Sequence, residues 1–323
     1  MVSYKVREES KLSAIIQTKH LSKSYKGHQA VKDISLRVNK GEIYGFIGLN
    51  GAGKTTIIRM LLGMIRPNQG ACYINGEKVS LTNSSIWKKV GYMVETPYSY
   101  PELTVEENLK IYGRLRLISD RQSIAKVMNQ LQLTKYATKK AKNLSLGNAQ
   151  RLGIAKALLS SPEVLILDEP VNGLDPAGIV EIRELLQDLA FHKGVTILIS
   201  SHILSEVAKI ATKIGIIHEG QLLQEMEATK LNQLLNQRLI IDCIDRRSAM
   251  SKLLATGYTC AINKNGFIEL YDKEAIYHPE TISRFLVFEG FPPSRLTVEE
   301  EDLESYFLRI IESKGTKSNE LLS

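Results

Sequence analysis

Residues Gly48 to Thr56 have the types and spacing of a phosphate-binding loop. They read Gly-Leu-Asn-Gly-Ala-Gly-Lys-Thr-Thr, which fits the pattern GxxxxGK[ST]. Glycines let backbone N–H groups approach phosphate oxygens, and a helix N-terminus behind them favours negative charge. In such a loop Lys54 reaches the β- and γ-phosphates, while the Thr55 hydroxyl holds Mg²⁺. The predicted phosphate-binding residues are Gly48, Asn50, Gly51, Gly53, Lys54, Thr55 and Thr56.

The segments on either side of this loop have the character that the loop requires. Residues 42–47 are apolar and strand-like, and residues 57–62 are helix-like. A strand, a glycine loop and a helix N-terminus together form an anion cradle, because the helix dipole adds about half a positive charge. The flanks therefore favour a phosphate site over a chance glycine-rich turn.

Two carboxylates follow a second apolar run. Residues 164–167 read Val-Leu-Ile-Leu, and Asp168 and Glu169 come directly after them. A buried strand of a parallel sheet carries such acids to the edge where phosphate loops lie. We expect Asp168 to bind Mg²⁺, through water, and Glu169 to orient or polarise an attacking water molecule.

The elements that position these residues alternate between strands and helices. Strand-like segments occupy residues 14–25, 30–38, 90–94, 164–167 and 195–199, and helical patterns occupy 101–138, 145–159 and 179–191. Alternation of this kind predicts an α/β fold with a mostly parallel sheet that is covered on both faces.

The order of predicted strands and helices changes after residue 238. The order from there to residue 313 is β-α-β-β-α-β followed by a helix, which matches a small split βαβ domain. Asn263-Lys264-Asn265-Gly266 is a good hairpin turn between the second and third of these strands. The sequence predicts a C-terminal α+β domain over residues 238–313.

Composition limits the classes of function. The 323 residues carry a formal net charge of +7, but the Lys and Arg residues are scattered, so no nucleic-acid partner is expected. The three cysteines are far apart and indicate neither a zinc site nor a disulfide framework. No apolar run reaches the roughly 18 residues of a membrane span, and the first residues are charged, so we expect a cytoplasmic protein.

The segment from Asn143 to Arg151 links these motifs to a known family. It resembles the signature LSGGQ followed by x-Q-R of the nucleotide-binding subunits of ABC transporters; the positions that match are Leu144, Ser145, Gly147, Gln150 and Arg151. Leu146 and Asn148 depart from it. The resemblance implies a P-loop NTPase of the ABC type over residues 14–225, with a mostly parallel sheet, an antiparallel β subdomain and a helical subdomain at about 96–160. It also implies hydrolysis of ATP with Mg²⁺.

The same resemblance assigns roles to further residues. Tyr25 occupies the position where the family stacks an aromatic ring on adenine, and His202 matches a switch histidine that contacts the γ-phosphate. Asp175 matches the acid of a loop that crosses a dimer interface. Ser145 and Gly147 of a second copy would cap the γ-phosphate. The implied catalytic residues are Lys54, Glu169 and His202.

Glu95 is a departure that bears on function. The family usually has glutamine here, which donates and accepts hydrogen bonds, whereas an ionised glutamate only accepts them. Glu95 still counts among the expected nucleotide and Mg²⁺ ligands, with Thr55 and Asp168. Glutamate here, an LSLG signature and about 90 residues past Gly220 make the chain similar to ATPases that export bacitracin or lantibiotics.

The resemblance also implies partners. We expect a polytopic membrane permease subunit, and a second copy of this chain or a related cassette that forms a head-to-tail dimer at the inner face of the membrane. The segment from Tyr98 to Val105 resembles the family's groove for a cytoplasmic helix of the permease. Two alternatives stay open: a soluble ABC ATPase of translation or chromosome maintenance, and a module that senses an antibiotic rather than pumping it.

Overall fold

The chain divides into two compact units. The computed structural model describes residues 14–80, 83, 85–95, 98–118 and 120–320. Their contacts separate a first unit, which ends at Thr229, from a second unit, which begins at Lys230. Each unit has its own β-sheet structure, helices and hydrophobic core.

The first unit begins with an antiparallel sheet of four strands in the order β2-β1-β4-β5. Its strands are β1 (Ala14–Tyr25), β2 (His28–Asn39), β4 (Gln69–Ile74) and β5 (Glu77–Lys78). Lys26 and Gly27 join β1 to β2, and both have positive φ angles, of 46° and 86°. A two-residue turn of this kind matches the right-handed twist of the strands.

A second sheet of six strands has the order β10-β9-β3-β8-β7-β6. Its strands are β3 (Ile43–Ile47), β6 (Val90–Met93), β7 (Val164–Asp168), β8 (Thr196–Ser201), β9 (Lys213–His218) and β10 (Gln221–Glu227). All neighbours are parallel except β9 and β10. Strands β3, β7 and β8 are buried along their whole length, as a sheet covered on both faces requires.

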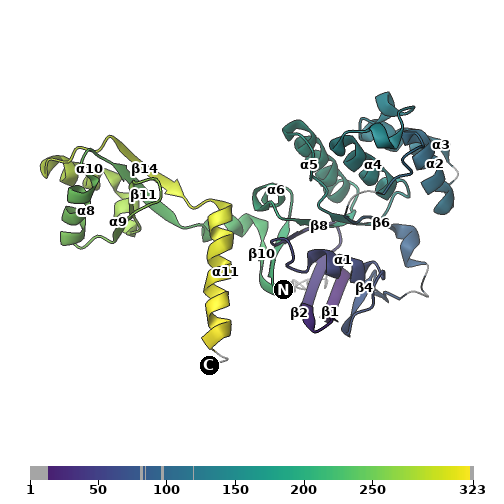
Figure 1. The fold of residues 1–323 in the computed structure, drawn as a ribbon, viewed down its shortest axis with the longest axis horizontal. Coiled ribbons are helices and arrows are strands. Elements are labelled where there is room, and N and C mark those ends of the chain that lie inside the picture. Colours follow the sequence, from purple (N-terminus) through teal and green to yellow (C-terminus); the bar gives the residue numbers. More distant parts are fainter. Residues whose placement is uncertain (1–13, 81–82, 84, 96–97, 119, 321–323) are drawn as a thin grey trace, which may run out of the picture. The chain divides into compact units, whose positions relative to one another are not determined.

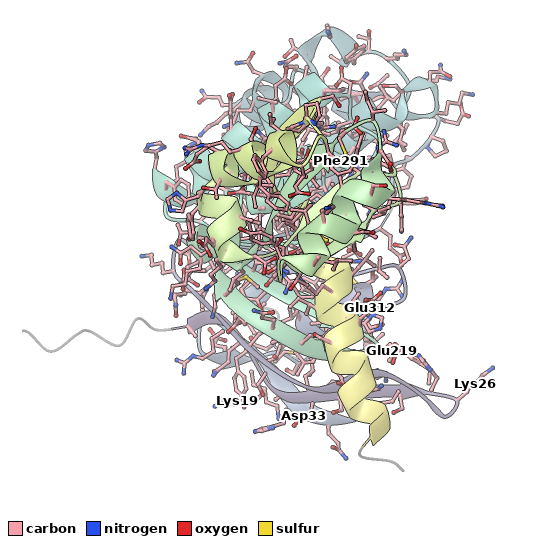
Figure 2. All side chains as sticks on the ribbon, turned by 90° about the vertical axis from the view of Figure 1, so that its left-hand side faces the viewer. Lys19, Lys26, Asp33, Glu219, Phe291 and Glu312 are labelled. Atoms are coloured by element: carbon pink, nitrogen blue, oxygen red, sulfur yellow. The ribbon has the colours of Figure 1, made fainter. Side chains whose placement is uncertain are left out.

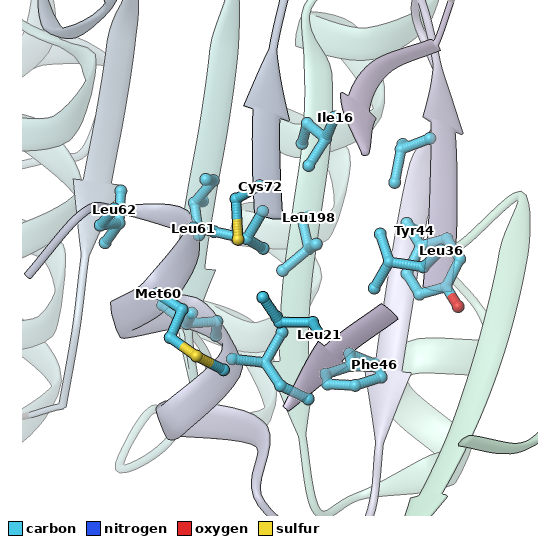
Figure 3. Close-up of a cluster of buried hydrophobic side chains, with 14 of the residues drawn as sticks. Ile16, Leu21, Leu36, Tyr44, Phe46, Met60, Leu61, Leu62, Cys72 and Leu198 are labelled. Carbon is cyan, nitrogen blue, oxygen red and sulfur yellow. The ribbon is translucent and has the colours of Figure 1, made fainter. Parts of the chain in front are cut away.

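Helices cover this sheet on both sides. Helix α1 (Lys54–Leu61) lies between the two sheets (Figure 1), and its residues Met60 and Leu61 belong to the core that the sheets share. Figure 3 shows them beside Leu21, Phe46 and Leu198 from strands of both sheets. The opposite face is covered by α4 (Leu146–Leu158), α5 (Pro176–Phe191) and α6 (Leu204–Ala208).

The remaining helices of the first unit begin at clear caps. Helix α2 (Val105–Leu115) has a capping box, in which Thr104 accepts from the Glu107 N–H and Glu107 accepts from the Thr104 N–H. The side chain of Asp120 caps α3 (Arg121–Gln130) by accepting from the N–H groups of Gln122 and Ser123. Short 3₁₀ turns lie at Ile86–Lys89, Thr134–Tyr136, Ala141–Asn143 and Ala228–Lys230.

The second unit contains an antiparallel sheet in the order β12-β13-β11-β14. Its strands are β11 (Gln237–Asp242), β12 (Cys260–Ile262), β13 (Ile268–Leu270) and β14 (Arg295–Glu300), and its helices are α7 (Leu231–Leu234), α8 (Arg246–Ala255), α9 (Lys273–Tyr277), α10 (Pro279–Phe288) and α11 (Leu303–Glu320). This strand order is the one that two split βαβ units produce. The turn at 263–266 closes with a hydrogen bond from the Asn263 N–H to the Phe267 carbonyl.

Sequence patterns missed part of this architecture. The helical pattern at 101–138 is two separate helices, α2 and α3, followed by a 3₁₀ turn. Four strands had no clear signal: β4 and β5 at the edge of the first sheet, and β9 and β10 at the edge of the second. Among the described residues, no helix combines the length and apolar character that crossing a membrane demands.

Replacing Leu198 by alanine should destabilise the first unit by about 2–5 kcal/mol, because the substitution leaves a cavity between the two sheets. Trp87, the only tryptophan in the chain, packs against this core. Its fluorescence during urea unfolding therefore measures the change. Leu115→Ala, at an exposed position on α2, serves as the control. Equal unfolding midpoints for the two variants would contradict the described core.

Candidate active site

The phosphate loop joins β3 to α1 and leaves no room for side chains at two of its glycines. A Cβ on Gly48 would lie 2.5 Å from the Ile217 carbonyl oxygen. A Cβ on Gly53 would lie 2.5 Å from the Ala30 carbonyl oxygen, and Gly53 also has a φ of +105°. The backbone of the loop is therefore held against β2 and β9 at positions that only glycine fits.

Lys54 is the first residue of α1, and only 6% of its surface is exposed. Its Nζ donates to the carbonyl oxygen of Gly48 at 2.6 Å, and it lies 3.7 Å from Glu169 Oε1. Burial lowers the pKa of Lys54, and the negative charges of Glu169 and Asp168 counteract that effect. A phosphate beside Nζ would act in the same direction as these carboxylates, so anion binding and the ammonium charge support each other.

Asp168 ends β7 between two hydroxyl donors. Thr55 Oγ1 donates to Asp168 Oδ2 at 2.8 Å, and Ser200 Oγ donates to Asp168 Oδ1. Ser200 is the residue of β8 that pairs with Asp168 in the parallel sheet. The carboxylate is buried and joins α1, β7 and β8, the three elements around the phosphate loop.

Glu169 is the first residue beyond β7 and points its carboxylate at His202. His202 Nδ1 lies 2.8 Å from Glu169 Oε2, and because a carboxylate only accepts, Nδ1 must carry the proton. Glu169 has a φ of +52°, a conformation that is uncommon for residues other than glycine. The buried side chain of Gln150 donates to its carbonyl oxygen at 2.7 Å and helps to hold this turn.

Most of these residues line a cavity of about 350 Å³, but Gly48, Ser200 and His202 do not. Predicted residues that line it are Asn50, Gly51, Gly53, Lys54, Thr55, Thr56, Glu95, Asp168 and Glu169. The structure also brings in residues without a predicted role: Ala30, Leu49, Ala52, Leu146, Gln150 and Asn172. Backbone N–H groups, one ammonium group and carboxylates in one cavity suit a polyphosphate that carries a divalent cation.

The oxygen donors in the cavity fit Mg²⁺. The Thr55 hydroxyl and the Asp168 carboxylate are hydrogen-bonded to each other, and Glu95 lines the same cavity. Across the residues that the structure describes, no three His, Cys, Asp or Glu side chains come together as a metal cage. Mg²⁺ usually binds through one or two carboxylates together with phosphate oxygens and water, so a sparse donor set is the expected one.

Three predicted residues line a different cavity. Ser145, Gly147 and Asp175 border a hollow of about 570 Å³, which Lys54, Thr55 and Asp168 do not reach. Ser145 caps α4 by accepting from the Asn148 N–H, and Asp175 caps α5 by accepting from the Gly178 N–H. Within one chain, Ser145 and Gly147 therefore border a different cavity from the phosphate loop, although Leu146 between them lines both.

Leu146 fits the signature segment without strain. It is the first residue of α4, so its backbone is helical and does not require glycine. Its side chain lies against Gly173, where an added Cβ would come within 2.3 Å of Leu146 Cδ2. Because Gly173 has no side chain, it leaves room for Leu146, the residue that stands where LSGGQ has its first glycine.

Tyr25 lies at the end of β1, next to the hairpin turn that Lys26 begins; Figure 2 shows Lys26 at the tip of this hairpin. The Tyr25 ring is 44% exposed and has Lys23 Nζ 5.2 Å from its centre. Tyr25 does not line the phosphate cavity, and its stacking on adenine stays a prediction.

Comparison with known proteins identifies the family. A model described as "ABC transporter" matches residues 31–172. Over 303 residues the chain is 39% identical to the bacitracin transport ATP-binding protein of Bacillus licheniformis, covering 93% of this chain and 98% of that protein. The chain belongs to the ABC transporter family. The predicted ABC fold and the predicted ATPase activity are thereby confirmed.

Three further similarities concern parts of this ABC ATPase. The lantibiotic transport ATP-binding protein of Streptococcus pyogenes is 37% identical over 231 residues, which are 71% of this chain and 99% of that protein. The solved structure of an ATP-binding subunit of an ABC transporter matches with a TM-score of 0.62 and 30% identity, covering 68% of this chain and 92% of that one. A dimeric bacterial ABC transporter cassette matches with a TM-score of 0.61 at 26% identity.

Sequence reasoning missed three residues that contact the predicted site. Gln150 was visible only as a match to the family motif, and its contact with Glu169 depends on how α4 packs. Ser200 precedes the Ser201-His202 pair, and its contact with Asp168 depends on strand register. Arg59 pairs with Glu95 at 2.6 Å, although no motif includes it.

Replacing Lys54 by alanine should remove most of the affinity for ATP, since Lys54 is the only lysine among the described residues that line the cavity. Equilibrium titration with a fluorescent ATP analogue measures the loss. Lys89→Ala, which removes an exposed lysine that does not line the cavity, is the matched control. Unchanged affinity in Lys54→Ala would refute the role of this lysine in binding phosphate.

Proposed function

We propose that this ABC ATPase powers a separate membrane permease that removes a peptide antibiotic of the bacitracin or lantibiotic type from the cell membrane. The observation that carries the proposal is the convergence of Lys54, Asp168 and Glu169 on one cavity. Similarity to bacitracin and lantibiotic transport proteins supplies the substrate class.

ATP binds in the cavity of about 350 Å³ that the phosphate loop lines. Backbone N–H groups of the phosphate loop and Lys54 bind the β- and γ-phosphates, and Tyr25 stacks on adenine. Thr55, Asp168 and Glu95 hold Mg²⁺, directly or through water, and the ion neutralises phosphate charge when it is bound. Phosphoryl transfer needs positioning and charge neutralisation rather than a covalent intermediate, and these residues provide both.

Glu169 and His202 act on the attacking water. Glu169 Oε2 accepts from His202, which leaves Oε1 to orient and polarise water in line with the γ-phosphate. His202 can donate from Nε2 as well as from Nδ1 only when the ring is an imidazolium.

The hollow of about 570 Å³ beside the start of α4 receives another cassette. Ser145 and Gly147 border it, and the N-terminus of α4 supplies backbone N–H groups that suit a γ-phosphate. Because Ser145 and Gly147 do not line the phosphate cavity of their own chain, they would cap the ATP of a second copy or of a related cassette. Asp175 lies at the same surface, and the dimeric ABC cassette that the chain resembles supports this arrangement.

The membrane partner docks beside Tyr98. This residue is 75% exposed and packs edge to face against Tyr100, with ring centres 5.7 Å apart. The Nζ of Lys156 on α4 donates to the Tyr98 carbonyl oxygen and to Ser99 Oγ, both at 2.8 Å. This aromatic surface is hydrogen-bonded to α4, the helix that begins in the signature segment. It therefore suits contact with a permease helix that lies at the inner face of the membrane and must respond to ATP.

The extent of the similarity favours the bacitracin type. The match to the bacitracin transport protein includes most of the second unit, whereas the lantibiotic transport protein matches over only 231 residues. The second unit is therefore a shared feature of this chain and the bacitracin relative. We assign it to the same transport system, as an accessory domain.

Glu169→Gln should retain ATP binding, accumulate an ATP-bound dimer and nearly abolish turnover, because the neutral amide cannot polarise water. Phosphate release and size-exclusion chromatography with ATP measure the two effects. Glu163→Gln, an isosteric change at an exposed glutamate, is the control. Turnover like that of the unaltered protein in Glu169→Gln would remove Glu169 from the mechanism.

The substrate can be tested in cells. Affinity purification of the Glu169→Gln protein from ATP-treated native membranes should recover a polytopic membrane protein. Expression of the chain together with that protein should raise the minimum inhibitory concentration of bacitracin or of a lantibiotic in a sensitive host, and the Glu169→Gln pair should not. An active ATPase pair that protects against neither antibiotic would exclude the proposed substrate class.

A further inference from the structure

Glu95 brings a negative charge to a cavity that is built for phosphate. It follows β6 by two positions and lines the same cavity as Lys54, Thr55 and Asp168. Its φ of +55° is uncommon for a residue with a side chain, so the surrounding structure must stabilise this conformation. An unneutralised carboxylate at this position would repel the phosphates of a nucleotide.

Arg59 provides the compensating charge. Its guanidinium nitrogen donates to Glu95 Oε1 at 2.6 Å, a short charge-assisted hydrogen bond. Arg59 lies on α1 one helical turn after Thr55, and residues four positions apart share a helix face. The helix that presents the Thr55 hydroxyl to the cavity therefore also presents the partner of Glu95.

The pair is accessible enough to change partners. The side chains of Arg59 and Glu95 are 40% and 57% exposed, so their interaction is partly screened by water. A carboxylate with two oxygens can keep one on Arg59 and offer the other to a cation, or leave Arg59 altogether. A buried pair would not have this freedom, because breaking it would strand a charge away from water.

We propose that Arg59 is a positioning residue that neutralises Glu95 and so allows a carboxylate to serve as a metal ligand in the phosphate cavity. This inference rests on the proposed function. Without Mg²⁺, Arg59 would hold the Glu95 charge away from the phosphates; with Mg²⁺ bound, Glu95 would be among the residues that hold the ion. The pair therefore makes nucleotide affinity depend on the metal.

The test is a double-mutant cycle with Arg59→Gln, Glu95→Gln and the combined variant, all in full-length Glu169→Gln protein so that ATP is not hydrolysed. Isothermal titration measures ATP affinity in EDTA and in excess Mg²⁺. Arg59→Gln should weaken metal-free ATP binding about five- to tenfold, because the freed carboxylate repels phosphate across a partly solvated gap. Mg-ATP binding should fall much less, because the carboxylate is then free for the ion.

Rescue by the second substitution separates this role from a structural one. Arg59→Gln together with Glu95→Gln should return metal-free ATP affinity to within about twofold of the parent, since both partners are then neutral. Arg66→Gln removes the same charge from an exposed arginine that does not line the cavity, and controls for overall charge. High salt should shrink the Arg59→Gln effect, as expected for exposed charges.

Several results would overturn the inference. Equal loss of metal-free and Mg-ATP affinity in Arg59→Gln, without rescue by Glu95→Gln, would make Arg59 a structural residue. An effect no larger than that of Arg66→Gln would show that Glu95 needs no partner. If the Glu169→Gln parent binds ATP, these results concern only Arg59; a parent that binds no ATP would overturn the proposed function as well.

Discussion

The hydrogen bond from Thr55 to Asp168 is the interaction on which the rest of the site depends. It joins the first turn of α1 to the end of β7, two elements that are 113 positions apart in the chain. The carboxylate is also held from β8, because the register of β7 and β8 pairs Ser200 with Asp168 and brings its hydroxyl to the other carboxylate oxygen. With Asp168 fixed in this way, the next residue, Glu169, is carried to the cavity and to His202.

Sequence could predict the parts of this arrangement that depend on local chemistry. The glycines, Lys54 and Thr55 follow one another in a single loop, so their motif alone predicted a phosphate site. Asp168 and Glu169 directly follow an apolar run, so their position predicted acids at the end of a buried strand. Their meeting in one cavity was predictable because parallel strands end at a common edge. The second unit was also foreseen in outline, since its strands and hairpin turn have ordinary periodic signals.

What sequence could not predict depends on packing between distant elements. Strands β9 and β10 pair with each other at the edge of the sheet, and short apolar runs of this kind do not reveal their neighbours. Gln150 and Arg59 contact the site only because α4 and α1 have particular rotations. The family resemblance implied that Ser145 and Gly147 do not line the phosphate cavity of their own chain. Only the folded structure shows that they border another cavity.

The contact between Leu146 and Gly173 has a consequence for how this protein can vary. A side chain at 173 would collide with leucine at 146, and its backbone, which has a φ of +75°, would be strained as well. A smaller residue at 146 would remove the collision and leave the backbone strain. Position 173 therefore stays restricted to glycine whichever residue stands at 146, whereas the exposed position 146 can vary as long as 173 is glycine.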